Sequence, residues 1–257
     1  MINVNNTTKI ALVTGSSRGL GKNTALALAK KGVDMIVTYR SSEAEAKSVV
    51  FEIEAMGGKA VALQLDTADT KTFAGFVAQL KRSLQNNWQR EQFDFLVNNA
   101  GIGINKPFAE TTEADFDRLM NIQLKGVFFL TQKLLPVIQD GGRIVNISSG
   151  LARFCLPGYA AYATMKGAIE VLTRYLAKEL GARQIAVNTI APGAIETDFG
   201  GGVVRDNQEI NNFIASQTAL DRVGVPDDVG GAITSLLSED NRWVNAQRIE
   251  VSSGMFL

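Results

Sequence analysis

Seven short apolar runs recur along the chain, and longer segments with helical periodicity separate them. The runs are rich in Val, Ile and Leu and do not alternate strictly with polar residues, as is typical of strands buried on both faces. Such strands need a crossover between neighbours, so the pattern predicts parallel βαβ units and a doubly wound sheet of about seven strands with helices on both faces. The runs are Ile10–Val13, Met35–Thr38, Ala60–Leu65, Phe93–Val97, Arg143–Ile147, Ile185–Ile190 and Arg248–Val251.

Helical patterns fill the intervals between these runs. Gly32 follows the first helix as a C-terminal cap, and Ser42 with Glu45 predicts a capping box at the start of the second. The third has apolar residues at helical spacing from Phe73 to Leu84. No repeat or break in composition divides the chain, so we expect one α/β domain over residues 1–257. The remaining patterns are Leu20–Lys31, Thr112–Ile138, Tyr159–Leu180 and Asp227–Leu237.

The stretch Gly193–Leu220 fits this alternation poorly, because it holds Gly200-Gly201-Gly202 and scattered polar residues. Two interpretations of residues 194–220 stay open at this point. The stretch is either a mobile lid over a site or a plain surface insertion.

Composition excludes several classes of function. The chain has no histidine, so a Ser-His-Asp hydrolase, a Cys-His protease and a His-ligated metal site are excluded, and we expect no metal. Lys and Arg together number 26, as do Asp and Glu. This balance argues against a nucleic-acid binder, which would carry a basic excess.

Cys155 is the single cysteine, so an internal disulfide is excluded and a reducing compartment, the cytoplasm, is expected. Residues Met1 to Lys9 are polar and lack an apolar core, so we expect no signal peptide there. Since no apolar run reaches about 18 residues, we also expect no membrane span.

A glycine-rich turn follows the first strand, with the sequence Thr14-Gly15-Ser16-Ser17-Arg18-Gly19-Leu20-Gly21. Gly15 permits a tight turn, and Gly19 and Gly21 allow the backbone to approach a phosphate and the helix to pack close to the sheet. The N-terminus of the following helix offers N–H groups and a positive dipole to a pyrophosphate. The turn therefore predicts a dinucleotide site in a Rossmann-type fold.

Three rival motifs fail at this turn. The segment Gly15–Gly19 matches the G-x-S-x-G nucleophile elbow, but without histidine the usual base for that serine is missing. A P-loop requires Gly at 16 and Ser or Thr at 23, which are Ser16 and Asn23, and G-x-G-x-x-G requires Gly in place of Thr24. The spacing T-G-x-x-x-G-x-G remains, and a glycine-rich turn without a ligand stays the alternative.

This spacing resembles the short-chain dehydrogenase/reductase family, and four further matches occur in the right order. Asn98-Asn99-Ala100-Gly101 closes the fourth strand, and Asn121 stands where the family keeps a helix asparagine. Ser149 precedes Tyr162 at the common family spacing, and Tyr162 with Lys166 forms Y-x-x-x-K. Pro192-Gly193-Ala194-Ile195-Glu196-Thr197 matches P-G-x-x-x-T. The C-terminal pattern departs from the family at Ala246, Ser252 and Ser253.

Hydride transfer to a carbonyl leaves an alkoxide that needs a proton, which a tyrosine can donate. The pKa of tyrosine is about 10, so work near pH 7 requires a nearby cation. Tyr162 and Lys166 are four residues apart on one helix face, and Ser149 can hydrogen-bond the substrate oxygen. The resemblance implies that Lys166 also reaches the nicotinamide ribose and that a helix break at Asn121 completes a proton relay. The expected catalytic set is Asn121, Ser149, Tyr162 and Lys166.

The expected cofactor contacts follow mainly from the resemblance. Asp66 would accept from the adenine amino group, and Asn98 and Ala100 would line the path to the ribose. Pro192 and Thr197 would lie near the carboxamide. The full set is Gly15, Ser17, Arg18, Gly19, Leu20, Gly21, Tyr39, Arg40, Asp66, Thr67, Asn98, Ala100, Gly101, Tyr162, Lys166, Pro192, Gly193, Ile195 and Thr197.

The end of the second strand favours NADP(H) over NAD(H). NAD-specific enzymes usually carry an acidic residue there, and the corresponding position is Tyr39. Arg40 follows at once, and Arg18 lies in the glycine turn on the same side of the adenosine ribose. Two guanidinium groups without a carboxylate favour a 2′-phosphate. The alternative is that Arg40 is an ordinary solvated residue.

The substrate is expected to be a partly apolar ketone or 3-oxoacyl compound, because the expected pocket walls carry Ile102, Ile104, Phe108, Leu151, Phe154, Leu156 and Phe199. The overall pattern is most similar to 3-oxoacyl-(acyl carrier protein) reductases. Their carrier docks on two basic positions, of which Arg183 fits the second. Asp140 stands at the first and would repel an acidic carrier.

Two other functions stay open at this stage: alcohol oxidation like that of glucose dehydrogenases, and a dinucleotide-binding regulator without turnover. A homodimer or homotetramer is expected, because the two longest helical patterns carry apolar residues on more than one face.

Overall fold

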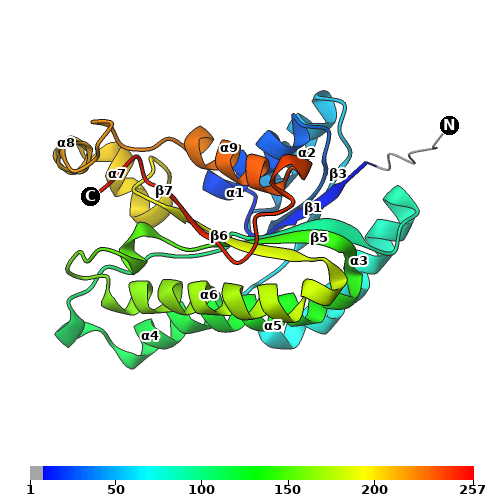
Figure 1. Ribbon diagram of the computed structural model, residues 1–257, viewed down its shortest axis with the longest axis horizontal. Coiled ribbons are helices and arrows are strands. Elements are labelled where there is room, and N and C mark those ends of the chain that lie inside the picture. Colours follow the sequence, from blue (N-terminus) through cyan, green and yellow to red (C-terminus); the bar gives the residue numbers. More distant parts are fainter. Residues whose placement is uncertain (1–7) are drawn as a thin grey trace.

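A computed structural model describes residues 8–257 and shows a seven-stranded, wholly parallel sheet in the order β3-β2-β1-β4-β5-β6-β7 (Figure 1). The predicted single-domain, doubly wound α/β fold is confirmed. The expectation for the stretch from Met1 to Lys9 lies outside the described residues except at its last two positions. The strands are β1 (Ile10–Val13), β2 (Asp34–Tyr39), β3 (Ala60–Gln64), β4 (Phe93–Asn98), β5 (Ile138–Ile147), β6 (Ala186–Pro192) and β7 (Arg248–Val251).

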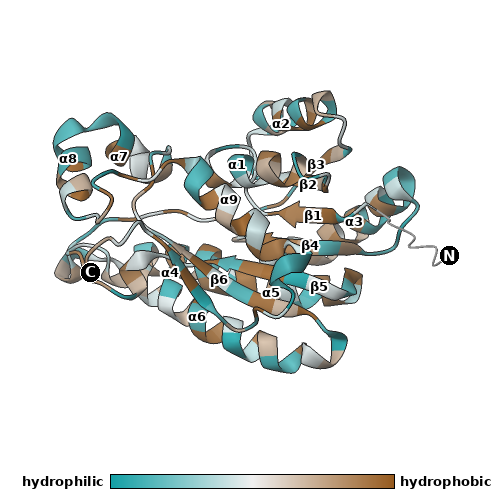
Figure 2. Ribbon diagram, turned by 45° about the horizontal axis from the view of Figure 1, so that its top comes forward, coloured by the Kyte–Doolittle hydropathy of each residue, from teal (hydrophilic) through white to brown (hydrophobic). Residues whose placement is uncertain are grey.

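Two layers of helices enclose the sheet. Helices α1, α2 and α9 cover one face, and α3, α5 and α6 cover the other, so each face has its own apolar core (Figure 1). Apolar residues concentrate in the strands between these layers, and polar residues gather on the outer sides of the helices (Figure 2). The helices are α1 (Gly19–Ala29), α2 (Glu43–Ala55), α3 (Phe73–Trp88), α4 (Glu113–Met120), α5 (Gly126–Leu134), α6 (Ala160–Glu179), α7 (Val203–Asp206), α8 (Gln208–Ser216) and α9 (Pro226–Leu237).

Burial on both faces explains why the strand sequences do not alternate. In β1, Ala11 and Val13 belong to the core beneath α1 and α9. Ile10 and Leu12, on the opposite face, belong to the core beneath α3, which also contains Phe73. Since successive side chains point to opposite faces, a strand between two apolar layers must be apolar throughout.

The helical pattern expected over Thr112–Ile138 is interrupted at Asn121, where the family resemblance implies a break, and it ends before Ile138. A π-helical turn, Asn121–Lys125, separates α4 from α5, and a 3-10 turn that contains Pro136 follows α5. Strand β5 then begins at Ile138 rather than at Arg143. The polar start of this strand hid it from an apolar pattern.

The capping prediction at Ser42 is also wrong in its detail. Ser42 occupies the N-cap position of α2, but its side chain forms no cap hydrogen bond with a described residue. Its backbone, at φ −91° and ψ 67°, lies outside the extended region that capping residues usually adopt. A full capping box stands instead at α4, where Thr112 and Asp115 bond each other's backbone N–H.

Buried amides and hydroxyls join the middle strands to the helices below them. The Asn98 amide donates to Asn146 Oδ1 at 2.8 Å and to Thr131 Oγ1 at 3.0 Å. The Asn146 amide donates to Thr173 Oγ1 at 2.9 Å, and the Thr189 hydroxyl lies 2.8 Å from the same oxygen. We call these five residues the amide–hydroxyl network. It ties β4, β5 and β6 to α5 and α6.

The stretch after β6 folds into α7 and α8 rather than into further sheet. Ile214 of α8 packs with Val223 and Met255 in a small apolar cluster of its own. Gly200, Gly201 and Gly202 all have positive φ, between 63° and 79°, a conformation that is strained for other residues. Within residues 8–257, helices long and apolar enough to cross a membrane are absent.

Gly126→Ala tests the close approach of α5 to the loop after β3. A Cβ at Gly126 would overlap the Thr67 carbonyl oxygen and lie 2.8 Å from Asn121 O. Alanine gains helix propensity of up to about 1 kcal/mol, but we expect overpacking to cost more, giving a net loss of about 1–3 kcal/mol in the free energy of unfolding. Urea denaturation measures it. Gly231→Ala in α9, with no described atom near its Cβ, is the control and should be neutral or stabilising. Equal effects of the two changes would contradict the packing.

Candidate active site

The turn after β1 is bonded directly to the turn after β4. Thr14 Oγ1 accepts from the N–H groups of Asn99 and Ala100, both at 2.9 Å. The Asn99 amide in turn donates to the carbonyl oxygens of Thr14 at 2.8 Å and Gly15 at 3.3 Å. Four hydrogen bonds therefore fix the two turns between β1 and β4, where the strand order reverses, and ligands bind at such a point in open α/β sheets.

Glycines make this junction tight. Gly15 has φ +64°, and a Cβ there would lie 3.1 Å from the Cα of Ala100. A Cβ on Gly21 would overlap the Gly15 carbonyl oxygen, so α1 begins directly against the turn. Gly19 differs, because no described atom lies within 4 Å of its Cβ position and only its φ of +56° requires glycine.

The first turn of α1 is suited to an anion. Arg18 is the N-cap, in extended conformation, and its side chain makes no cap hydrogen bond within the described chain. The first turn, which starts at Gly19, carries no acidic side chain. The N–H groups and the positive end of the helix dipole are therefore available to a pyrophosphate. Of the predicted residues, Ser17 precedes the N-cap and Leu20 lies in the first turn, and both are half-buried.

An exposed basic side chain, Arg40, follows the end of β2. Tyr39 is half-buried against the core, and Arg40 is exposed with its carbonyl accepting from the Gln64 amide at 2.9 Å. Arg18 is exposed as well. At the end of β3, Asp66 accepts from the Ala68 N–H at 2.9 Å, which holds its carboxyl group in a local turn beside Thr67.

The side chain of Asn98 is held in the core, and its expected place on the path to a ribose stays a prediction. It is buried at 4% exposure, and its amide is engaged in the amide–hydroxyl network. Ala100 and Gly101 do lie at the strand end. Gly101 is kept small by Gln123, whose Oε1 would lie 2.9 Å from a Cβ there.

The segment after β6 passes beside the C-terminal end of β7. Pro192 is buried at the strand end, and the Gly193 N–H donates to Val251 O at 3.0 Å. Ile195 is half-buried and forms an isolated bridge with Gly224. Thr197 is buried, and its Oγ1 accepts from the Phe199 N–H at 3.2 Å. The predicted residues of this segment thus reach the same edge of the sheet as the glycine turn.

Ser149 and Tyr162 come together, as expected. Ser149 follows β5 and caps a 3-10 turn by accepting from the Leu151 N–H at 3.2 Å. Tyr162, in the first turns of α6, is 6% exposed. Burial raises the pKa of Tyr162 above its ordinary value, and a hydrogen bond with the Ser149 side chain acts in the opposite direction.

Lys166 lies one helical turn beyond Tyr162 and is 5% exposed. Its Nζ donates to the carbonyl oxygen of Ile147 at 2.8 Å and lies 5.5 Å from the centroid of the Tyr162 ring. Burial lowers the pKa of Lys166 to about 7. The low dielectric thus disfavours an isolated tyrosinate and an isolated ammonium alike, and each charge stabilises the other.

Asn121 begins the π-helical turn, so the local helix break that the family resemblance implies is present. Its carbonyl accepts from the Gly126 N–H, five residues on, which leaves one lone pair for a further donor. π turns of this kind occur frequently at functional sites.

The apolar walls differ in part from the expectation. Ile102, Ile104 and Leu151 pack in the cluster around Tyr162, and the Phe199 ring lies 5.9 Å from the Tyr162 ring. Phe154 instead packs on Phe256 at 4.9 Å, in the cluster of α8 and the C-terminus. Phe108 is 84% exposed and lines a separate groove of about 250 Å³ between α4 and α6.

The sequence analysis did not identify the polar residues that hydrogen-bond to the backbone of the site. Ser16 is fully buried, with its hydroxyl donating to Val13 O at 2.8 Å and accepting from the Thr38 N–H at 2.9 Å. Thr38 Oγ1 accepts from the Gly15 N–H at 3.0 Å. Gln123 donates to Ile102 O at 2.5 Å from the π turn. A polar residue at the end of an apolar strand, such as Thr38, was the available signal.

Comparisons with known proteins agree with this geometry. Residues 15–256 match the family model described as enoyl-(acyl carrier protein) reductase. The hydroxynaphthalene reductase-like protein Arp2 of Metarhizium brunneum is 37% identical, with 96% of this chain and 94% of that protein covered.

Two solved structures are similar over almost their whole length. One is the promiscuous reductase LugOII, which catalyses keto-reduction at C1 during lugdunomycin biosynthesis (TM-score 0.92, 37% identity, 98% of this chain and 99% of that chain covered). The other is the angucycline C-6 ketoreductase LanV with bound NADP (TM-score 0.92, 34% identity, 98% and 97% covered).

The lowered pKa of Lys166 predicts a pH-dependent stability. Between pH 7 and the ordinary pKa of 10.5, the unfolded chain binds a proton at this lysine that the folded chain lacks, so the free energy of unfolding rises with pH. This rise should amount to roughly 2–3 kcal/mol between pH 7.5 and pH 9.5, and Lys166→Met should abolish it. Urea denaturation at both pH values measures the difference. Lys178→Met, at an exposed lysine of the same helix, should keep it; identical slopes in the two variants would refute the assignment.

Proposed function

The chain belongs to the short-chain dehydrogenase/reductase family of oxidoreductases, and we propose that it reduces a ketone carbonyl with NADPH, with Tyr162 as the proton donor. The observation that carries the proposal is the grouping of Ser149, Tyr162 and Lys166 beside the glycine turn. A regulator without turnover is set aside, because the chain is an oxidoreductase. The direct test follows NADPH absorbance with a panel of ketones, quinones and 3-oxoacyl thioesters. Absence of turnover with all of them would refute the proposal.

The hydrogen-bond donors around the glycine turn suit a dinucleotide that carries a 2′-phosphate. The uncapped start of α1 and the tight Gly15–Gly21 contact would form a cradle for a pyrophosphate, and the exposed Arg18 and Arg40 would be the donors to a 2′-phosphate. LanV has been solved with bound NADP, which supports the same class of cofactor here. When bound, the nicotinamide supplies the hydride. Asp66 is the proposed contact at the adenine end of the dinucleotide, and Ile195 and Thr197 are the proposed contacts at the nicotinamide end.

The protein's part in the reaction is to orient the carbonyl and to deliver a proton. The Ser149 hydroxyl donates to the substrate oxygen and holds it beside the Tyr162 hydroxyl. Tyr162 transfers its proton to that oxygen as negative charge develops there. Lys166 stabilises the tyrosinate that remains, since its ammonium group is one helical turn away in a buried site. The Asn121 carbonyl can then accept from the water that returns the proton.

We propose a flat, largely apolar ketone as substrate. Aromatic rings border the proton donor on two sides, with Phe199 at 5.9 Å and Tyr159 at 6.4 Å from the Tyr162 ring. Ile102, Ile104 and Leu151 complete the apolar surroundings. Rings of this kind favour contact with planar π-systems. The similarity to a hydroxynaphthalene reductase-like protein and to an angucycline C-6 ketoreductase supports a substrate of this type. Sugar oxidation like that of glucose dehydrogenases fits these walls less well.

A carrier-linked substrate is the weaker alternative. Arg183, the one base at a carrier-docking position, is paired with Asp140 at 2.7 Å. The same guanidinium also donates to the carbonyl oxygens of Leu135 at 2.8 Å and Ile138 at 2.6 Å. Its charge is therefore offset and its donors are engaged, which disfavours an acidic carrier.

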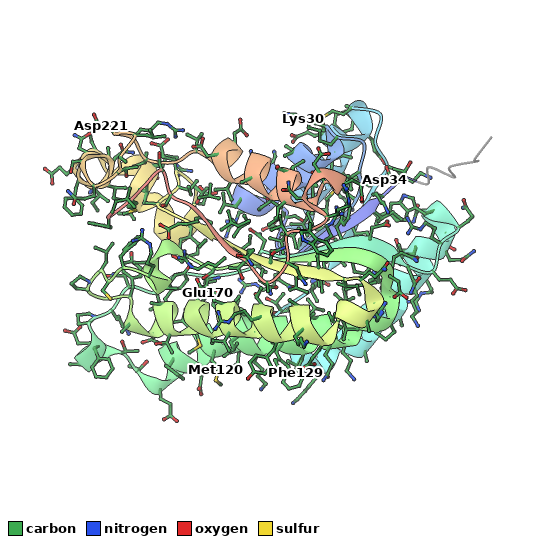
Figure 3. The ribbon with its side chains drawn as sticks, in the orientation of Figure 1. Lys30, Asp34, Met120, Phe129, Glu170 and Asp221 are labelled. Carbon is green, nitrogen blue, oxygen red and sulfur yellow. The ribbon has the colours of Figure 1, made fainter. Side chains whose placement is uncertain are left out.

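We also propose that the chain assembles as a homodimer or homotetramer through the outer side of the α4–α6 layer. Large apolar side chains are exposed on these helices, and Phe129 points away from the sheet (Figure 3). Monomers rarely leave such a surface uncovered. The exposed residues are Phe116, Phe128, Phe129, Val171 and Tyr175.

Tyr162→Phe should lower kcat by roughly 10²–10⁴-fold, because only the proton donor is lost. Binding of NADPH, followed by fluorescence titration, should stay close to wild type. Tyr159→Phe is the matched control and should retain kcat, since Tyr159 lacks a lysine four residues on. A Tyr162→Phe variant that kept more than about a tenth of the wild-type kcat would exclude Tyr162 as general acid.

The wild type should prefer NADPH to NADH by roughly ten- to a hundredfold in kcat/KM, the equivalent of one charge-assisted pair of about 1.5–3 kcal/mol. Arg40→Asp removes a donor and adds a repelling charge, so it should erase or invert this preference. Arg82→Asp, on the exposed side of α3, should leave the ratio unchanged. Equal kcat/KM for both cofactors in the wild type would defeat the argument.

Sedimentation of the wild type should show a multiple of the 27.7 kDa chain. Phe129→Glu places a charge in the proposed interface and should shift the population toward monomer. Phe51→Glu is the control, because Phe51 is 72% exposed on α2 in the other helix layer. A wild type that sediments only as a 27.7 kDa species would rule out the assembly.

A further inference from the structure

Four charged side chains form a continuous series of ion pairs beside the site, which we call the ion-pair chain. Glu170 of α6 accepts from Arg248 Nε at 2.7 Å, and Arg248 Nη1 donates to Glu250 Oε2 at 2.8 Å within β7. Arg153, after the 3-10 turn that follows Ser149, donates to both oxygens of Glu250 at 2.6 and 2.7 Å. Figure 3 shows Glu170 on the side of α6 that faces the sheet.

The charges of the ion-pair chain alternate, so two positive groups balance two negative ones. Three of the four side chains, Glu170, Arg248 and Glu250, are only 14–24% exposed. Hydrogen bonding from Arg153 helps to hold the pKa of Glu250 at about 2, so this carboxylate stays charged at neutral pH. Removing one member would leave a partly buried charge without its partner, which the surroundings accommodate only by moving.

The ion-pair chain contacts the backbone that carries Ser149. The Ser148 hydroxyl donates to Glu170 Oε1 at 2.7 Å, and Arg248 Nη2 donates to the Ser149 carbonyl at 3.4 Å. Strand β5 ends at Ile147, so Ser149 lies beyond the regular sheet. Its backbone is therefore held by these charged groups together with two backbone bonds, from the Ser148 N–H to Ile190 O at 2.7 Å and from the Ala152 N–H to the Ser149 carbonyl at 3.1 Å.

The other end of the ion-pair chain holds the C-terminus. Arg153 Nη2 donates to Met255 O at 2.7 Å and its Nη1 to Phe256 O at 3.2 Å. The Phe256 ring lies 4.9 Å from Phe154, and its N–H donates to Gln217 O at 2.9 Å. The C-terminal residues thus join the loop after Ser149 to the segment that follows α8.

We propose that the ion-pair chain positions Ser149 for the reaction, with Arg248 as the central positioning residue. The proposal rests on the function proposed above, in which the Ser149 hydroxyl orients the substrate oxygen. Arg248 acts through the Ser149 carbonyl and through Glu170, which holds Ser148. A displacement of Ser149 by even about 1 Å would separate its hydroxyl from the productive geometry, at a cost of up to about 10²-fold in rate.

The competing explanation is that these ion pairs only fasten β7 to the edge of the sheet. The two roles differ in what they change. A fastening role lowers stability and leaves the turnover of the folded enzyme intact. A positioning role lowers kcat while NADPH affinity and the fold persist.

The test compares Arg248→Met and Glu250→Gln with Arg143→Met. Arg143 is the matched control, because it is a 7% exposed arginine in the middle of β5 that is paired with Glu239 at 3.2 Å. We expect both test variants to lose roughly ten- to a hundredfold in kcat at nearly unchanged NADPH affinity, and Arg248→Lys to recover part of it. Arg143→Met should lower only the melting temperature. Wild-type kcat in folded Arg248→Met and Glu250→Gln would overturn the proposal.

Amide hydrogen exchange supplies a second readout that does not depend on turnover. In Glu250→Gln, exchange should accelerate at residues 149–154 and 255–256 relative to Arg143→Met, because both segments depend on the Arg153 pair. Unchanged exchange there would overturn the positioning role even if no substrate is turned over. A wild type without turnover on the ketone panel, with accelerated exchange in Glu250→Gln, would refute only the proposed function.

Discussion

The junction between the turns after β1 and β4 is the constraint on which the site depends. Thr14 Oγ1 accepts two N–H groups from the β4 turn, and the Asn99 amide returns two bonds to the β1 turn. With these bonds made, a Cβ on Gly21 would overlap the Gly15 carbonyl oxygen, and Gly15 combines a positive φ with a close neighbour in Ala100. The start of α1 is then fixed relative to the sheet, and its N–H groups point out of a rigid frame. The phosphate site proposed here would therefore be formed before its ligand binds.

Tyr162 and Lys166, the proposed catalytic pair, show how burial and charge oppose each other. Low dielectric raises the pKa of Tyr162 and lowers that of Lys166, so each residue alone tends to be neutral. Together they can hold a charge that neither holds singly, because a tyrosinate and an ammonium stabilise each other strongly out of water. The carbonyl of Ile147 gives the lysine a partner in the meantime. The sheet thus takes part in the electrostatics of the site through its backbone.

The sequence was sufficient for the parallel sheet because burial on both faces leaves a direct trace, the continuous apolar runs of β1, β4 and β6. The sequence also predicted that Ser149, Tyr162 and Lys166 lie close together, because the spacing of the motifs places them at the same edge of the predicted sheet. The sequence did not predict how two of the motif and pocket side chains pack. Asn98 is a core residue although it belongs to a motif, and Phe154 packs against the C-terminus. Such choices depend on contacts between distant segments, which no local pattern encodes. In β5, the apolar pattern predicted Arg143–Ile147 and missed only the polar residues before it, which include Gly141 and Gly142.

The amide–hydroxyl network has a consequence for how the chain assembles. Asn146 donates to Thr173 of α6 and accepts from Asn98, which also needs Thr131 of α5. If one helix docks without the other, a buried amide is left without a partner and pays its full desolvation cost. A strand shifted by one residue would turn the same amides to the wrong face. The network therefore penalises half-assembled and misregistered sheets more than it stabilises the finished one, and it makes the closing of this half of the sheet a single cooperative event.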